Sequence, residues 1–202
     1  MRFGVLVSGS GTNLQALLDA RSRGELDPAQ LVGVISNRPD VQALERAKRA
    51  EVPTRLIDHK SFDSRPGFEV ALAEALDAWN GDALILAGFM RVLTADFVAR
   101  YPHRIINTHP ALCPAFPGIR APQQAIDAGV KVSGCTVHFV DAGVDTGPII
   151  FQAAVEVRDS DDAGSLHRRI QAHEHRLLPQ AARLLAADRL RVDGPRVRIA
   201  PS

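Results

Sequence analysis

Residues 3–13 read FGVLVSGSGTN, and this stretch decides the fold class. Phe3 to Val7 is a short apolar run with β-branched residues, which predicts a buried strand. Ser8 to Thr12 forms a glycine-rich turn, and a helix is expected to open at about Asn13. A strand that leads through a tight turn into a helix is the first half of a βαβ unit.

The same alternation of strand and helix continues along the chain. Apolar runs short enough for strands lie at 31–35, 55–57, 83–86 and 104–107. Longer stretches with helical spacing separate them, as between Phe68 and Trp79. Regular alternation of this kind predicts an α/β fold with a doubly wound, mostly parallel sheet flanked by helices.

The pattern changes after Pro122. Residues 134–140 and 149–157 are consecutive strand candidates joined by a turn-rich segment, which predicts an antiparallel addition and therefore a mixed sheet. No linker, internal repeat or low-complexity tract interrupts the chain. We therefore expect a single domain over residues 1–202.

The last part of the chain predicts a long helix and a hairpin. Apolar residues with helical spacing run from Leu166 to Leu185, with Asp161 or Asp162 as the expected N-cap. Pro179 is expected to kink this helix. Residues 192–194 separate two runs of alternating arginine and aliphatic residues, which predicts a hairpin.

Composition and charge exclude several classes of protein. Of 202 residues, 46% are hydrophobic and 23% are charged, so the chain is neither disordered nor fibrous. A net charge of +1 argues against a nucleic-acid partner, and no apolar run is long enough to span a membrane. With only Cys113 and Cys135, and no signal-peptide pattern, we expect a protein of the reducing cytoplasm. Monomer and homodimer both stay open.

Gly11, Thr12 and Asn13 are candidates for binding a phosphate group. A glycine-rich turn at a helix N-terminus presents unpaired backbone N–H groups and the positive end of the helix dipole. Position 14 is leucine, so the dinucleotide fingerprint is broken, and no P-loop lysine follows. The interpretation that remains is a single phosphomonoester, with an ordinary capped turn as the alternative.

Asn107, His109 and Asp145 are candidates for chemistry. Asn107 and His109 lie two residues apart where a strand ends, so both can point into one crevice at the carboxyl edge of the sheet. If Asp145 in the loop 141–148 faces His109, its carboxylate favours the charged imidazolium, which is a proton donor. A hydrogen-bonded loop histidine and a turn-forming aspartate are the alternatives.

The other polar candidates carry weaker signals. His138 is interpreted as a core or cleft histidine rather than a catalyst. His167, His173 and His175 do not converge on one helix face, so a metal site is not expected there. Glu174 is either an exposed charge or a ligand for a substrate amine.

Taken in order, several segments resemble the glycinamide ribonucleotide formyltransferase family. The matching segments span nearly the whole chain: SGSGTNLQA at 8–16, ISN at 35–37, LERA at 44–47, SFDSR at 61–65, LAGFMRVL at 86–93, NTHPALCPAFPG at 107–118, TVHFVDAGVDTGPII at 136–150 and EH at 174–175. The resemblance implies a formyltransferase-like Rossmann variant. It also implies two halves, one for the nucleotide phosphate at about 1–100 and one for the folate and catalysis at about 101–202.

The resemblance further implies the substrates and the residues that hold them. Glycinamide ribonucleotide would be bound by Gly11, Thr12, Asn13, Gln171, Ala172, His173 and Glu174. The co-substrate 10-formyltetrahydrofolate would be bound by Arg65, Met90, Arg91, Val92, Leu93, Asn107, Asp141, Ala142, Gly143, Val144 and Asp145. Asn107, His109 and Asp145 would be catalytic, with no metal.

The sequence departs from the family pattern at three positions and leaves relatives open. Ala111, Cys113 and Arg120 stand where serine, leucine and histidine are frequent in the family. Formyltetrahydrofolate deformylase and methionyl-tRNA formyltransferase resemble the same segments, but each usually carries a further domain that we do not expect here. A catalytically silent nucleotide- or folate-binding protein is the remaining alternative.

Overall fold

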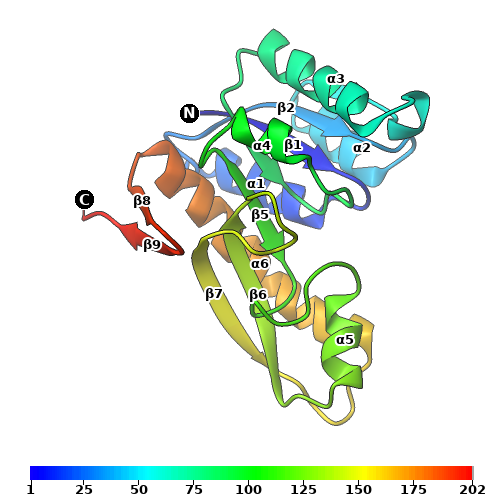
Figure 1. Cartoon of the computed structure of the whole chain (residues 1–202), viewed down its shortest axis with the longest axis vertical. Coiled ribbons are helices and arrows are strands. Elements are labelled where there is room, and N and C mark those ends of the chain that lie inside the picture. Colours follow the sequence, from blue (N-terminus) through cyan, green and yellow to red (C-terminus); the bar gives the residue numbers. More distant parts are fainter. Residues whose placement is uncertain (202) are drawn as a thin grey trace.

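A computed structural model describes residues 1–201 and contains one nine-stranded sheet with six α-helices (Figure 1). The strands are β1 (Arg2–Val7), β2 (Gln30–Ser36), β3 (Thr54–Leu56), β4 (Ala83–Leu86), β5 (Ile105–His109), β6 (Val132–Phe139), β7 (Ile149–Glu156), β8 (Leu190–Asp193) and β9 (Arg196–Ile199). The helices are α1 (Thr12–Ser22), α2 (Gln42–Arg49), α3 (Arg65–Ala78), α4 (Ala95–Ala99), α5 (Ala121–Asp127) and α6 (Ala163–Ala186), with a 3₁₀ turn, η1, at His59–Ser61.

The strands lie in the order β3-β2-β1-β4-β5-β6-β7-β9-β8. Strands β1 to β5 are parallel, whereas β6 is antiparallel to both β5 and β7. The mixed, mostly parallel sheet predicted from the sequence is thus confirmed. Strands β2 and β3 extend the sheet on one side of β1, and β4 and β5 then extend it on the other side. The strand order therefore reverses beside β1. In open α/β sheets this is where ligands bind.

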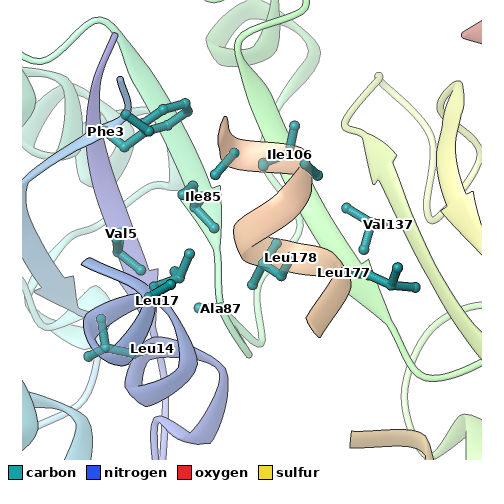
Figure 2. Close-up of a cluster of buried hydrophobic side chains, with 14 of the residues drawn as sticks. Phe3, Val5, Leu14, Leu17, Ile85, Ala87, Ile106, Val137, Leu177 and Leu178 are labelled. Carbon is teal, nitrogen blue, oxygen red and sulfur yellow. The ribbon is translucent and has the colours of Figure 1, made fainter. Parts of the chain in front are cut away.

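Both faces of the central strands β1 and β4 are buried: successive side chains point to opposite faces, and helices cover each face. In β1, Phe3, Val5 and Val7 pack with α1, α2 and α6, while Leu6 packs with α3 and α4. Figure 2 shows the first of these clusters, with Leu14 and Leu17 of α1 and Leu177 and Leu178 of α6 meeting the sheet. Because helices cover both faces of these strands, nearly every residue of the strands is apolar, which is why the sequence shows them as continuous apolar runs.

Element boundaries differ from the sequence prediction in places that affect the site. The fifth strand, expected to end at Asn107, continues to His109, so that histidine is 4% exposed and belongs to the sheet rather than to a loop. Asp162 is the N-cap of α6, in a capping box with Ser165. The helix runs past Pro179 to Ala186 without interruption. Strands β8 and β9 form the predicted hairpin.

No helix within residues 1–201 combines the length and the apolar character needed to cross a membrane.

Candidate active site

A cleft of about 850 Å³ opens along the carboxyl ends of β1, β4 and β5. Its walls come from the turn after β1, the segment after β4, the loop between β6 and β7, and the first turns of α6. Gly11, Asn107, Asp145 and Glu174 all line it. Segments far apart in the sequence therefore meet in one concave site, at the sheet edge that the topology predicts for ligands.

The turn between β1 and α1 offers an anion site. Gly11 is the N-cap of α1 with φ of 73°, a left-handed conformation that glycine adopts without strain. No side chain caps this helix end, and the N–H groups of Thr12, Asn13 and Leu14 have no acceptor within residues 1–201. These unpaired donors and the helix dipole both favour a phosphate.

Glycine is required at position 11 by space as well as by conformation. A Cβ there would lie 2.7 Å from Cβ and 2.8 Å from Cα of Ala43, the first buried residue of α2. Gly9, two residues earlier, has nothing within 4 Å of the equivalent position. Of these two glycines in the turn, Gly11 is therefore the one that brings the backbone close to α2.

Asn107 and His138 form the centre of a polar cluster. Strands β5 and β6 run antiparallel with Asn107 directly opposite His138, so the two side chains lie on the same face. Asn107 Nδ2 lies 3.2 Å from His138 Nε2 and 3.5 Å from Asp145 Oδ1. Nδ1 of His138 lies 2.7 Å from the Phe139 carbonyl oxygen, and its Nε2 lies 3.6 Å from Asp145 Oδ1 as well as close to Asn107.

His109 is held between two acceptors. Its Nδ1 lies 3.3 Å from Asp145 Oδ2, and its Nε2 lies 2.8 Å from the carbonyl oxygen of Phe116. A neutral imidazole donates from only one ring nitrogen, whereas the imidazolium donates from both. Each ring nitrogen of His109 thus faces an acceptor of its own. Nε2 must exchange the Phe116 carbonyl for a substrate atom before it can take part in chemistry.

Asp145 is fixed and ionised by its surroundings. Its backbone has φ of 55°, and its Oδ2 accepts the Gly118 N–H at 2.8 Å. Burial alone would raise the pKa of this carboxyl, but the hydrogen bonds from His138 and Gly118 and the charge of His109 outweigh burial and lower the pKa below its usual value. Asp145 is therefore a carboxylate at neutral pH.

Glu174 joins the turn after β1 to strand β5. It is 1% exposed; one carboxylate oxygen accepts from Thr108 Oγ1 at 3.0 Å and the other from Asn13 Nδ2 at 3.4 Å. One turn earlier, Gln171 Nε2 donates to Thr12 Oγ1 at 3.2 Å. The amide oxygen of Asn13 is buried and has no partner within residues 1–201. A buried carboxylate and an unpaired oxygen beside each other suit a ligand that brings hydrogen-bond donors.

The structure brings most of the predicted site residues to the cleft, but not all. Those that line it are Gly11, Thr12, Asn13, Met90, Arg91, Val92, Leu93, Asn107, His109, Asp141, Gly143, Val144, Asp145, Gln171 and Glu174. Ala172 and His173 turn away, because on a helix only residues three or four apart share a face with Gln171 and Glu174. Arg65 is the first residue of α3, exposed and outside the lining, and Ala142 is also outside it.

The sequence did not predict the contacts of His138 with Asn107 and Asp145. Its interpretation as a core or cleft histidine accounts for its 2% exposure but not for its contacts with Asn107 and Asp145. The missing signal was the β5–β6 register: once the two strands are paired antiparallel, His138 falls opposite Asn107. Within residues 1–201, no three His, Cys, Asp or Glu side chains are arranged to hold a metal ion.

The family model described as "Formyl transferase" matches residues 1–182. The chain belongs to the formyl transferase family. It is 46% identical over 96% of its length to the phosphoribosylglycinamide formyltransferase of Mycobacterium tuberculosis (strain ATCC 25618 / H37Rv), of which it covers 88%. It is also similar to the crystal structure of glycinamide ribonucleotide transformylase 1 from Symbiobacterium toebii, with 52% identity, a TM-score of 0.96, and coverage of 100% of this chain and 94% of that one.

Longer relatives match this family member over only part of their length. The trifunctional purine biosynthetic protein adenosine-3 of Drosophila melanogaster is 50% identical over 91% of the chain, which spans 14% of that relative. The similarity thus extends to a protein of about the same length and to a small part of a much longer, trifunctional one.

Proposed function

We propose that this chain transfers the formyl group of 10-formyltetrahydrofolate to the amine of glycinamide ribonucleotide, a step of purine biosynthesis. The observation that carries the proposal is the meeting of two features in one cleft: the phosphate turn at Gly11 and the cluster of Asn107, His109 and Asp145. One domain would hold both substrates, with the nucleotide phosphate in its first half and catalysis in its second.

The nucleotide would enter with its phosphate at the N-terminus of α1. The unpaired N–H groups of Thr12, Asn13 and Leu14 would bind the phosphate oxygens. Glu174 would accept hydrogen bonds from the sugar or the glycinamide end, since it is buried and lies between the phosphate turn and β5. This orientation points the amine toward Asn107 and His109.

The reaction needs hydrogen-bond donors that stabilise negative charge on the formyl oxygen, and a route for one proton. The amine nitrogen attacks the formyl carbon, and negative charge grows on the formyl oxygen as the tetrahedral intermediate forms. Asn107 has a second N–H, whose contact with Asp145 at 3.5 Å is weak enough to be replaced by that oxygen. Protonated His109 would be the second donor once Nε2 leaves the Phe116 carbonyl.

Collapse of the intermediate breaks the bond between the formyl carbon and N10 of the folate. The amine loses one proton and N10 gains one, so no proton is left over. Asp145 stabilises the imidazolium of His109 and, through water, assists this transfer. The products are formylated glycinamide ribonucleotide and tetrahydrofolate, and no covalent enzyme intermediate is required.

The loop 141–145 and the segment 90–93 would form the folate pocket. Asp141, Gly143 and Val144 line the cleft on one side, and Met90 to Leu93 line it on another. Val144 is 44% exposed and Met90 58% exposed, apolar surface that a bound ring system would cover. Arg65 and Ala142 would contribute only if the cleft changes shape around the ligand.

We place the reaction in the cytoplasm. Cys113 and Cys135 are both free and buried, and burial raises the pKa of the Cys135 thiol to about 12 and raises that of Cys113. Unpaired, unreactive thiols suit a reducing compartment. Monomer or homodimer stays a prediction, which light scattering of the purified protein would test.

The test follows the absorbance of the folate with glycinamide ribonucleotide, with methionyl-tRNA and with neither. Turnover only with the nucleotide supports the transferase. Turnover without it identifies a deformylase, turnover only with methionyl-tRNA identifies a tRNA formyltransferase, and binding without turnover identifies a silent binding protein; each of these three results overturns the proposal. A His109→Ala variant controls for turnover by contaminating enzymes.

A further inference from the structure

Glu69 is a buried carboxylate that the proposed mechanism does not use. It lies on α3 and is 3% exposed. Oε1 accepts the backbone N–H of Thr94 at 2.7 Å, and Oε2 accepts the hydroxyl of the same threonine. No lysine, arginine or histidine lies within ion-pairing distance of Glu69 in the described part of the chain. Within residues 1–201, both hydrogen bonds that this carboxylate accepts therefore come from Thr94.

Stability alone does not account for a glutamate at this position. Its neighbours on α3, Phe68 and Leu72, are buried apolar residues of the core. Burying a carboxylate among such residues is unfavourable unless its hydrogen bonds compensate, and an apolar residue of similar size is often at least as stable. The specific contribution of Glu69 is to fix the position of Thr94.

Thr94 ends the segment that lines the cleft after β4. Its hydroxyl oxygen also accepts the N–H of Phe97 at 3.3 Å as the N-cap of α4. At the other end of the segment, the N–H of Met90 donates to Ser8 Oγ at 2.8 Å. Ser8 is itself buried and donates to Asn37 Oδ1 at 2.6 Å. Side chains from α3 and from the end of β1 therefore hold the segment at both ends.

The middle of the segment keeps its hydrogen-bond donors unused. The N–H groups of Arg91, Val92 and Leu93 meet no acceptor within residues 1–201. The guanidinium of Arg91 lies 5.8 Å from the ring centroid of Phe68, so α3 contacts the segment at two consecutive residues, Phe68 and Glu69. A backbone segment that is fixed at both ends and has free N–H groups in its middle is suited to bind a planar ring that accepts hydrogen bonds.

We propose that Glu69 is a positioning residue for the folate co-substrate, acting through Thr94 to hold residues 90–93 in the geometry that binds the ring system. This inference rests on the proposed function, because it takes the folate as the ligand of the segment. Glu69 itself does not line the cleft, so its effect is indirect. It should act on the folate and leave the nucleotide unaffected, since the phosphate turn and Glu174 lie on other elements.

The first experiment measures steady-state kinetics of Glu69→Gln. The amide keeps the size of the side chain, but its NH₂ cannot accept from the Thr94 hydroxyl, so that hydrogen bond must reverse its direction and both contacts lose the charge of the carboxylate. We expect KM for 10-formyltetrahydrofolate to rise by about tenfold, with KM for glycinamide ribonucleotide and kcat within about twofold of wild type. Glu74→Gln is the matched control, because Glu74 lies on the same helix and is exposed.

A second pair of variants changes Thr94 instead, and keeps the inference testable if Glu69→Gln does not fold. Thr94→Ser keeps the hydroxyl and should retain the wild-type KM for the folate. Thr94→Val keeps the branched shape, removes the hydroxyl and should raise that KM. If Glu69 acts through Thr94, the double variant Glu69→Gln/Thr94→Val will be no worse than the more impaired single variant.

The outcomes separate this inference from the proposed function. A folded Glu69→Gln that changes neither KM, or both equally, overturns the positioning role while leaving the transferase intact. If the wild type shows no formyl transfer, the proposed function fails. Calorimetric titration with 5,8-dideazafolate, a probe that carries no formyl group to transfer, then decides the role of Glu69: weaker binding in Glu69→Gln supports it, and an unchanged Kd overturns it.

Discussion

Asp145 Oδ2 lies 3.3 Å from His109 Nδ1, with both side chains almost fully buried. The carboxylate is therefore the nearest negative charge available to stabilise an imidazolium. Replacing it by asparagine keeps the shape and removes that charge, so we expect kcat at pH 7 to fall by roughly 10² in Asp145→Asn. Steady-state assays of the purified variant measure this, with Asp159→Asn, an exposed aspartate outside the cleft, as the control. A near-normal kcat would remove Asp145 from the catalytic group.

His109→Ala should lower kcat by roughly 10² or more, the contribution of a positioned donor. Because His109 is buried and bonded on both sides, the variant also leaves the Phe116 carbonyl without its side-chain donor and removes one of the partners of Asp145. We therefore expect a loss of stability of about 1–3 kcal/mol as well. Urea unfolding separates the two effects. If kcat stayed near wild type in the folded variant, the catalytic assignment would be wrong.

The lowered pKa of Asp145 predicts how stability changes with acid. In the unfolded chain this carboxyl takes up a proton near its usual pKa of 3.8, whereas in the fold it does so only at a lower pH. Between these two pH values the unfolded chain binds more protons, so stability rises with pH there. The contribution of Asp145 is fully present well above pH 3.8 and is lost as the pH falls through the lowered pKa.

The corresponding measurement is the urea midpoint of wild type and Asp145→Asn over a series of pH values. We expect the difference between the two proteins to be largest near pH 6 to 7 and to shrink below about pH 4. A difference that stayed constant, or grew on acidification, would contradict the direction of the pKa shift.

Gly11→Val tests the phosphate turn. The substitution places a branched side chain at φ of 73° and within 2.8 Å of the backbone of Ala43, so the turn must open. We expect KM for glycinamide ribonucleotide to rise at least about tenfold, or roughly 1.4 kcal/mol of lost binding, with folate binding nearly unchanged. Gly24→Val is the matched control, because Gly24 has a similar φ of 71°, has nothing within 4 Å of the added Cβ, and lies outside the cleft. Equal weakening of both substrates in a folded variant would mean that the turn is not a dedicated phosphate site.

The sequence predicted the architecture because the central parallel strands are buried on both faces. Such strands appear as short apolar runs whatever their neighbours are, so the runs containing Val5 and Ile85 could be read directly. Boundaries were less accurate where polar residues continue a strand. His109 still belongs to β5, although the apolar run has already ended.

The site was predictable only where one segment carries the signal. Asn107 and His109 share a strand, and Gly11 to Asn13 form one turn, so local spacing identified them. The contacts of His138 depend on the register between β5 and β6, which spacing along one strand does not contain. From the sequence, Glu69 looks like an ordinary solvent-exposed glutamate of an amphipathic helix. Its burial and its contact with Thr94 depend on where residues 90–94 lie in the fold, which the sequence pattern does not show.

The position of α6 has a consequence for how the protein is made. Gln171 and Glu174 reach the turn after β1 by contacting Thr12 and Asn13, residues 159 and 161 positions earlier in the chain. During synthesis the first βα unit leaves the ribosome long before α6 does. The proposed nucleotide site therefore lacks the contacts of α6 until most of the chain has emerged, and a nascent chain cannot gain their share of ligand binding before then.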